Sequence, residues 1–334
     1  MTTQNNNSMC RGIRQIQGIG KVAGGYCLRQ LLKGRDALIM IKIENNKMRL
    51  TLTLFVLPAL LIYTLFQIMP LIGALFFSFM EWNGIGGSAL RFVGLKNYMD
   101  AFRNPNFILS LENMFKMVVF SVLLHTPIAL IMAAIINTKC KGYRIFKALF
   151  FVPTVFPMTA VGLMWYFVFM PMGVFNSFLT TIGLSGVTQA WLVNPGTAMN
   201  TIVVVNIWAG VGYYMVILLA GLTTISEDIY EAAAIDGANT LQCFFKITVP
   251  MLKSTIVMCI LMDIIGSVKV FDLVFAMTGG GPNGLTNLPT TLMYNEAFKY
   301  SHYGVGSAIG IIIMIVCLTG TIISNRLISK KNAR

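Results

Sequence analysis

The chain has 334 residues, of which 56% are hydrophobic and only 11% are charged, whereas a soluble globular domain carries about 25% charged residues. So few charges cannot cover soluble domains, and the composition favours one membrane domain. The formal charge of +13 first suggests nucleic acid. The basic residues, however, fall in short runs between long apolar stretches, a pattern that marks the cytoplasmic side of membrane proteins. We therefore expect no nucleic-acid partner.

The first 47 residues are polar, basic and rich in asparagine at the start, and they contain no apolar stretch followed by a cleavage site. They do not resemble a secretory signal. We expect either a loosely ordered, basic cytoplasmic tail over 1–47 or translation that starts at Met48. A short amphipathic helix on anionic lipid is a further alternative. The membrane domain is expected over 48–334.

Uncharged windows predict six membrane-spanning helices, because a helix needs about 20 apolar residues to cross about 30 Å of hydrocarbon. No charged residue occurs over 148–226, but prolines and glycines interrupt the middle of that tract and divide it into two spans. The expected spans are 55–79, 117–136, 148–170, 199–222, 252–277 and 304–324. The predicted fold class is an all-α membrane protein with six transmembrane helices.

The distribution of lysine and arginine predicts which connections face the cytoplasm. Basic residues crowd the segment before the first span, the connection between the second and third spans, and the C-terminal end. The opposite connections carry fewer. We therefore expect a multi-pass protein of the bacterial cell membrane with both termini in the cytoplasm.

The connection between the fourth and fifth spans, 223–251, is too polar to be buried and is predicted to form two short helices. Ser226 can cap the first helix, and Gly237 can end it. Asn239, with Gln242 three residues later, has the pattern of a capping box that opens the second helix.

This loop resembles the E-A-A-x-x-x-G-x(9)-I-x-L-P signature of ABC importer permeases, with Val249 in place of the usual leucine. The matching residues are Glu231, Ala232, Ala233, Gly237, Ile247 and Pro250. Pro250 is also expected to end the second helix. Three further segments, 92–98, 151–165 and 270–282, resemble the carbohydrate-uptake branch. Within that branch the chain is similar to the first permease of a heterodimeric pair, of the glycerol-3-phosphate, lactose and maltose type.

The resemblance implies that the first loop helix is a coupling helix, docked in a groove on a cytoplasmic ATPase subunit. Small alanines permit close seating, Glu231 and Asp236 offer charges to a basic rim, and Gly237 permits a sharp turn. The implied partners are a second permease subunit, two ATPase subunits that bind the ATP, an extracytoplasmic solute-binding protein and membrane lipid. A helix lying on lipid is the alternative, which an acidic loop facing an anionic leaflet makes unfavourable.

No catalytic site is predicted. No G-x-x-x-x-G-K-[ST] phosphate-binding loop occurs, so the chain is not expected to hydrolyse ATP or to hold a cofactor. Gly279, Gly281 and Gly284 match the spacing of a dinucleotide loop, but they follow an apolar span, and we interpret them as an external turn. His125 and His302 lack a surrounding ligand cluster in the sequence, which favours structural roles over a metal or acid–base site.

Ionisable residues inside spans are the best pointers to a solute path. Asp263 lies about 11 residues into the fifth span, or about 17 Å at 1.5 Å per residue, near the middle of the bilayer. It is a candidate solute contact, and a hydrogen bond to a neighbouring helix is an equal alternative. Lys269 and Asp272, three residues apart, are expected to neutralise each other.

The fourth span offers amide, aromatic and hydroxyl groups that suit a polyhydroxylated ligand. The candidates are Asn206, Trp208, Tyr213 and Tyr214. Aromatic side chains in membrane helices also serve packing, which is the alternative for these residues. With the family resemblance, the span predicts a path for a sugar or sugar-like solute.

An ion-coupled secondary transporter and a membrane enzyme are the rival classes. A secondary transporter is favoured by paired ionisable residues within the membrane and by two repeated halves. An enzyme needs convergent His, Asp or Cys groups. The sequence shows no convincing repeat and no such convergence.

Overall fold

The computed structural model describes residues 46–139 and 141–332. The tail expected over 1–47 lies outside the described residues except for its last two. The contacts divide the chain into two units, 1–66 and 67–334.

The first unit contributes helix α3, Asn46–Tyr63, and the start of the π-helical turn η1, Thr64–Ile68. The side chains of α3 from Leu50 onward are apolar or hydroxylated, and they are exposed. Such a surface fits a helix surrounded by lipid, because hydrocarbon solvates apolar side chains about as well as a protein core does.

The second unit begins with a small lobe in which one asparagine side chain bridges two backbone carbonyl groups. The buried Asn97 amide donates hydrogen bonds to the carbonyl oxygens of Ser78 at 2.9 Å and Met80 at 2.8 Å. Two short antiparallel strands lie beside it, with Met80 opposite Phe92. The elements of this lobe are α4 (Met69–Phe77), β1 (Met80–Glu81), β2 (Arg91–Phe92) and α5 (Lys96–Arg103).

The centre of the second unit is built on α6, against which α10 and α14 pack. The side-chain oxygen of Asn104 accepts a hydrogen bond from the backbone N–H of Asn106 at 3.0 Å, and Pro105 occupies the first turn, where its missing N–H costs nothing. These residues start α6 well before residue 117, the expected start of the second span. The helices of this part are α6 (Pro105–Asn137), α7 (Tyr143–Val155), α8 (Met158–Phe169), α9 (Val174–Thr181), η2 (Ser185–Val187) and α10 (Ala198–Leu222).

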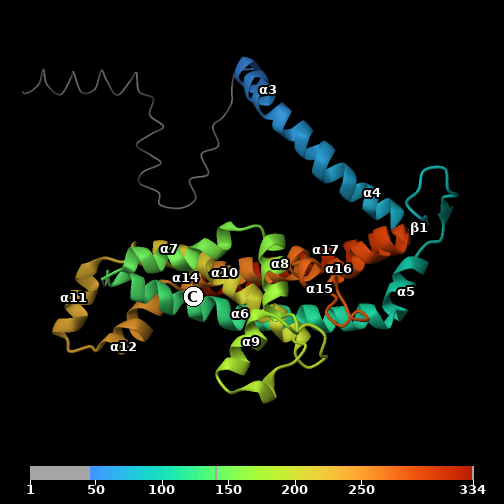
Figure 1. The fold of residues 1–334 in the computed structure, drawn as a ribbon. Helices are drawn as coiled ribbons and strands as arrows, with labels where there is room; N and C mark the ends of the chain where they lie inside the picture. Colours follow the sequence, from blue (N-terminus) through green and yellow to red (C-terminus); the bar gives the residue numbers. More distant parts are fainter. Residues whose placement is uncertain (1–45, 140, 333–334) are drawn as a thin grey trace, which may run out of the picture. The chain divides into compact units, whose positions relative to one another are not determined.

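The rest of the second unit holds the polar loop and the last helices. The elements are α11 (Glu227–Ile235), α12 (Thr240–Cys243), η3 (Phe244–Thr248), α13 (Val249–Met251), α14 (Lys253–Val268), α15 (Asp272–Thr278), α16 (Pro289–Tyr294), η4 (Asn295–Lys299) and α17 (Tyr303–Asn332). Within this unit α11 and α12 lie at one end, and α5 and β1 lie at the other (Figure 1). Segments on opposite sides of a membrane would be separated in this way.

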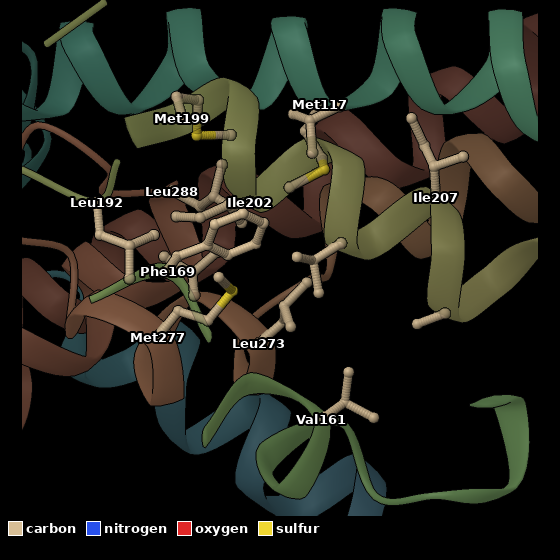
Figure 2. Packing of buried hydrophobic residues seen from close by; sticks show 14 residues of the cluster. Met117, Val161, Phe169, Leu192, Met199, Ile202, Ile207, Leu273, Met277 and Leu288 are labelled. Carbon is tan, nitrogen blue, oxygen red and sulfur yellow. The ribbon is translucent and has the colours of Figure 1, made fainter. Parts of the chain in front are cut away.

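Two buried clusters hold the second unit together. One joins Met117 of α6, Ile202 of α10 and Leu273 of α15 (Figure 2). The other joins residues of α6, α10 and α14, among them Met215 and Cys259. In lipid such clusters stabilise a fold through close packing rather than through removal of water.

Among residues 46–139 and 141–332, five helices are long and apolar enough to cross a membrane, or six if one bent pair counts as a single span. The five are Leu50–Phe77, Pro105–Asn137, Met158–Thr181, Ala198–Leu222 and Tyr303–Ile322; the bent pair is Thr240–Met251 with Lys253–Val268. Of the predicted all-α fold with six spans, the coarser part is confirmed: the protein is mostly helical and crosses the membrane several times.

The third expected span, 148–170, is not one continuous helix. α7 ends at Val155 and α8 begins at Met158, with a break between them. A proline disfavours the helical conformation in the residue before it. Phe156, which precedes Pro157, accordingly has an extended backbone with ψ 143°.

The fifth expected span, 252–277, is also interrupted. α14 ends at Val268, and α15 begins at Asp272, whose carboxylate favours a helix N-terminus. At its other end α14 is bent by 69° from the preceding helical segment. Because Lys269 and Asp272 do not share a helix, the expected pairing is not found, and no ion pair joins them among the described residues.

Candidate functional site

A buried pair of ionisable side chains joins α6 and α14. The Nδ1 atom of His125 lies 3.0 Å from the Oδ1 atom of Asp263, and these side chains are only 3% and 2% exposed. The hydroxyl of Tyr214 on α10 donates to the same Oδ1 atom at 3.3 Å. Asp263 therefore makes the interhelical hydrogen bond that was one of its two expected roles.

The pair belongs to a larger polar network. The Nε2 atom of His125 lies 3.3 Å from the backbone oxygen of Asn206, whose side-chain amide donates to the Ser121 hydroxyl at 3.1 Å. The Ser267 hydroxyl donates to Oδ1 of Asp263 at 3.4 Å. The Oδ2 atom of Asp263 is buried and has no hydrogen-bond partner among the described residues. Since buried polar atoms are normally satisfied, Oδ2 lacks a hydrogen bond that a further donor would supply.

The network borders a cavity of about 320 Å³. The predicted residues Asn206, Tyr213, Tyr214 and Asp263 all line it. Trp208, the fifth predicted residue, does not line it: its ring packs edge to face on Trp165, with the ring centroids 5.2 Å apart. Further lining residues are His125, Thr154, Met158, Ala209, Gly210, Gly266, Ser267 and Val270.

His125 is the main residue of this site that sequence reasoning missed, because a histidine without a nearby ligand cluster favours a structural role. A usable signal was present. His125 and Asp263 both lie deep within expected spans, and ionisable residues inside a membrane tend to pair with one another.

The polar loop between α10 and α14 begins with a capped helix, as predicted. The Ser226 hydroxyl oxygen accepts a hydrogen bond from the backbone N–H of Asp228 at 3.4 Å. At the other end Gly237 adopts a left-handed conformation with φ +80°. The next backbone N–H, of Ala238, then donates to the carbonyl of Ala233 at 2.9 Å and closes the helix.

The second loop helix begins with the predicted capping box. The backbone N–H of Gln242 donates to the Asn239 side chain at 2.8 Å, and the Asn239 N–H donates to the Gln242 side chain at 2.9 Å. Pro250 does not end this helix, contrary to expectation. The chain passes through the π-helical turn η3 and stays helical to Met251, because Pro250 stands in the first turn of α13, where it needs no N–H partner.

The loop exposes three large apolar side chains. Ile235, Leu241 and Phe245 are 87%, 69% and 64% exposed. Of the signature residues and Asp236, those that are exposed are Glu231, Ala232, Asp236, Gly237 and Pro250, and those that are half-buried are Ala233 and Ile247.

The remaining motifs are structural. The element before the glycines of 279–284 is helix α15 rather than a strand, and Gly279 ends that helix in a left-handed conformation, which confirms the turn. Its external position stays a prediction. The Nδ1 atom of His302 lies 2.9 Å from Oε2 of Glu296. Within the described part of the chain, no group of three or more His, Cys, Asp or Glu could hold a metal ion.

Comparison with known proteins shows the family. The model of the binding-protein-dependent transport system inner membrane component matches residues 125–334. A probable ABC transporter permease protein of Bacillus subtilis, YurN, is 34% identical over 82% of this chain and 94% of its own length. The trehalose/maltose transport system permease protein MalF of Thermococcus litoralis is 33% identical over 81% of this chain and 90% of its own length.

A solved structure shares the fold. One chain of a bacterial ABC transporter involved in the import of the acidic polysaccharide alginate superposes with a TM-score of 0.74 and 23% identity, over 84% of this chain and 96% of that chain. The protein described here belongs to the family of binding-protein-dependent transport system inner membrane components, the permease subunits of ABC transporters, which are not themselves enzymes.

Proposed function

We propose that this permease subunit forms part of the path by which an ATP-driven importer carries a sugar or sugar-like solute across the membrane. The observation that carries the proposal is the cavity of about 320 Å³ inside the region that matches the family. Amide, hydroxyl and carboxylate groups beside aromatic rings suit a polyhydroxylated ligand, and Asn206, Tyr213 and Asp263 supply them. The relative MalF, named for trehalose and maltose transport, supports the same solute class.

A second permease subunit completes the path in this proposal. Tyr213 lines the cavity and yet is 43% exposed, so the wall of the cavity is incomplete within a single chain. The resemblance to the first permease of heterodimeric pairs favours a different chain as the partner. An extracytoplasmic binding protein delivers the solute, in keeping with the family's description.

Helix α11 serves as the coupling helix that seats in a groove on an ATPase subunit. Support comes from the apolar loop residues Ile235, Leu241 and Phe245, which nothing in this chain covers among the described residues. The signature residues and Asp236 form the contact with the ATPase subunit. The small alanines allow close approach, the two carboxylates face a basic rim of the groove, and Gly237 forms the turn. Two ATPase subunits bind the ATP, and their closure moves the membrane helices through these contacts.

Six spans with both termini in the cytoplasm fit this arrangement. α14, the second member of the bent pair, belongs to the fifth span, and the first member, Thr240–Met251, stays in the loop. An ion pair supports placing the connection after α6 and the loop before α14 on the same side of the membrane. In it, Nζ of Lys139 lies 3.3 Å from Oε1 of Glu227. Lys139 belongs to the basic connection after α6, and Glu227 begins the coupling helix. The excess of lysine and arginine in that connection favours the cytoplasm.

Reconstitution tests the proposal. Purified under mild conditions, this chain should bring down a second permease and an ATPase subunit. The complex in proteoliposomes should take up sugar only when ATP and the binding protein are supplied. Uptake by the isolated chain without ATP would overturn the proposal.

An ion-coupled secondary transporter is the second candidate, since the His125–Asp263 pair is the kind of paired intramembrane site that such a carrier uses. Family membership argues against it. One measurement distinguishes the importer from the secondary transporter. An uncoupler that collapses the proton gradient should leave ATP-driven uptake in proteoliposomes unchanged. It should abolish uptake by a proton-coupled carrier.

A further inference from the structure

The cavity beside Asp263 also bears on the charge of the solute, on the premise that it belongs to the proposed solute path. The fold does not fix this charge, because the alginate importer of similar fold handles an acidic polysaccharide. Among the described residues, those that line the cavity include the carboxylate of Asp263 and the imidazole of His125 but no lysine or arginine.

On the side of the cavity that this chain forms, an anionic solute would find no compensating charge. An anion that leaves water needs a cation or several hydrogen-bond donors to replace its hydration. The lining side chains of this chain include one carboxylate and no lysine or arginine, so they hold no permanent positive charge. Both ring nitrogens of His125 are also engaged, Nδ1 with Asp263 at 3.0 Å and Nε2 with the Asn206 carbonyl at 3.3 Å. The imidazole therefore has no N–H left for an anion.

A hydroxyl group, in contrast, can supply the hydrogen bond that the network lacks. The Oδ2 atom of Asp263 is buried without a partner among the described residues. A sugar hydroxyl that donates to this atom would satisfy it and would keep the net charge of the site unchanged. We propose that this cavity admits uncharged, hydroxylated solutes and excludes anionic ones such as sugar phosphates and uronates.

Thiol chemistry at the cavity wall can measure this selectivity without knowledge of the natural solute. Thr154 lines the cavity and is half-buried, so Thr154→Cys places a thiol of similar size there. Two reagents of similar size are compared: 2-hydroxyethyl methanethiosulfonate, which is neutral, and 2-sulfonatoethyl methanethiosulfonate, which is anionic. Each forms a disulfide with the thiolate and releases methanesulfinate. Because both react with the same thiolate, their rate ratio cancels any change in thiolate fraction.

The control thiol is Thr181→Cys, at an exposed position at the end of α9 and away from the cavity lining. The complete importer complex is held in lipid nanodiscs, so both membrane faces are accessible. The adduct at each position is followed by mass spectrometry of its peptide, so the 6 native cysteines can remain. The neutral-to-anion rate ratio at Thr154→Cys should exceed that at Thr181→Cys by about tenfold, as expected for a desolvated site of this charge.

Two further variants change the charge of the cavity. Adding Asp263→Asn to Thr154→Cys should lower the ratio towards that of the control. Adding Met158→Lys, which places a cation on the same wall, should lower it as well by attracting the anion. Equal ratios at the two thiols, or a ratio that neither charge variant moves, would overturn the inference. A thiol at 154 that reacts with neither reagent would also overturn it, because the cavity would then be closed to solutes. Sugar uptake by the unmodified complex would still support the proposed function in each of these cases.

Discussion

His125 and Asp263 stand 138 positions apart in the sequence, yet Nδ1 of the first lies 3.0 Å from Oδ1 of the second, inside a membrane domain. The contact joins α6 to α14, and Tyr214 brings α10 to the same carboxylate oxygen. Three helices thus share one buried carboxylate that borders the candidate solute cavity. A residue in this position can affect both packing and transport, and substitutions can separate the two roles.

Asp263→Asn should lower solute uptake about tenfold without stopping assembly. Asparagine keeps the size of the side chain, and its oxygen can still accept hydrogen bonds from His125 and Tyr214. Its amide nitrogen replaces Oδ2 and cannot accept a solute hydroxyl, and one lost hydrogen bond to a charged group costs about 1.5 kcal/mol or more. The measurements are uptake in proteoliposomes and recovery of the intact complex.

Asp272→Asn is the matched control, because Asp272 is exposed at the start of α15 and does not line the cavity. It should keep full uptake. If Asp263→Asn also transports at full speed, or if the complex is lost, Asp263 has a structural role alone.

A pair of glycines on the same cavity predicts opposite effects on stability. A Cβ atom added at Gly210 would lie 2.8 Å from Nε2 of His125, whereas one added at Gly266 would meet nothing within 4 Å in the described part of the chain. Gly210→Ala must displace the imidazole, whose nitrogens lie 3.0 Å from Asp263 and 3.3 Å from the Asn206 carbonyl, and should cost about 1–3 kcal/mol. Gly266→Ala should be neutral or stabilising by about 0.5–1 kcal/mol, because alanine is the better helix former.

Thermal unfolding of the purified complex checks this pair. The midpoint temperature should fall for Gly210→Ala and stay or rise for Gly266→Ala. Equal shifts in the two variants would mean that the imidazole is not held where the structure places it.

The sequence predicted those features that a few neighbouring residues determine. The Ser226 cap, the reciprocal bonds of Asn239 and Gln242, and the left-handed turn at Gly237 each depend on backbone groups only a few positions away. Pro157 also marked the break between α7 and α8 in the sequence. The span 148–170 was nevertheless predicted as one helix, because only the length of the apolar stretch was considered.

Other features depend on which helix faces meet, and no periodicity in one chain fixes that. The pairing of His125 with Asp263 requires a particular rotation of α6 against α14. The exclusion of Trp208 from the cavity likewise follows from its packing on Trp165. The interruption after Val268 has no proline to mark it, so the fifth span looked continuous.

The membrane topology can be tested by labelling single cysteines. A cysteine in place of Asn194, an exposed residue between α9 and α10, should react with a membrane-impermeant reagent in intact cells. A cysteine in place of Ser329, near the end of α17, should react only after the membrane is permeabilised. The prediction rests on the basic residues that follow the last span. Reversed labelling would place both termini outside and would remove the basis for a cytoplasmic coupling helix.

Gly237 allows the proposed coupling role of the loop to be separated from its folding. Its φ of +80° is unfavourable for residues with a side chain by about 1–2 kcal/mol, and β-branched residues suffer most, whereas asparagine tolerates this region. An added Cβ would meet nothing within 4 Å in the described part of the chain. The first added carbon at 237 therefore meets no steric obstacle there, and we expect added volume to act mainly against a partner.

Gly237→Val and Gly237→Asn exploit this difference. Both add volume, but only valine adds strong backbone strain. Valine should abolish association with the ATPase subunit and solute-stimulated ATP hydrolysis, while insertion of the chain in the membrane persists, since exposed loop changes usually cost within about 0.5 kcal/mol beyond such strain. If asparagine restores both readouts, the turn itself is what the loop requires. If asparagine fails as valine does, the partner's groove closes tightly on Gly237. If valine keeps normal stimulated hydrolysis and uptake, this loop is not the lever that couples ATP hydrolysis to transport.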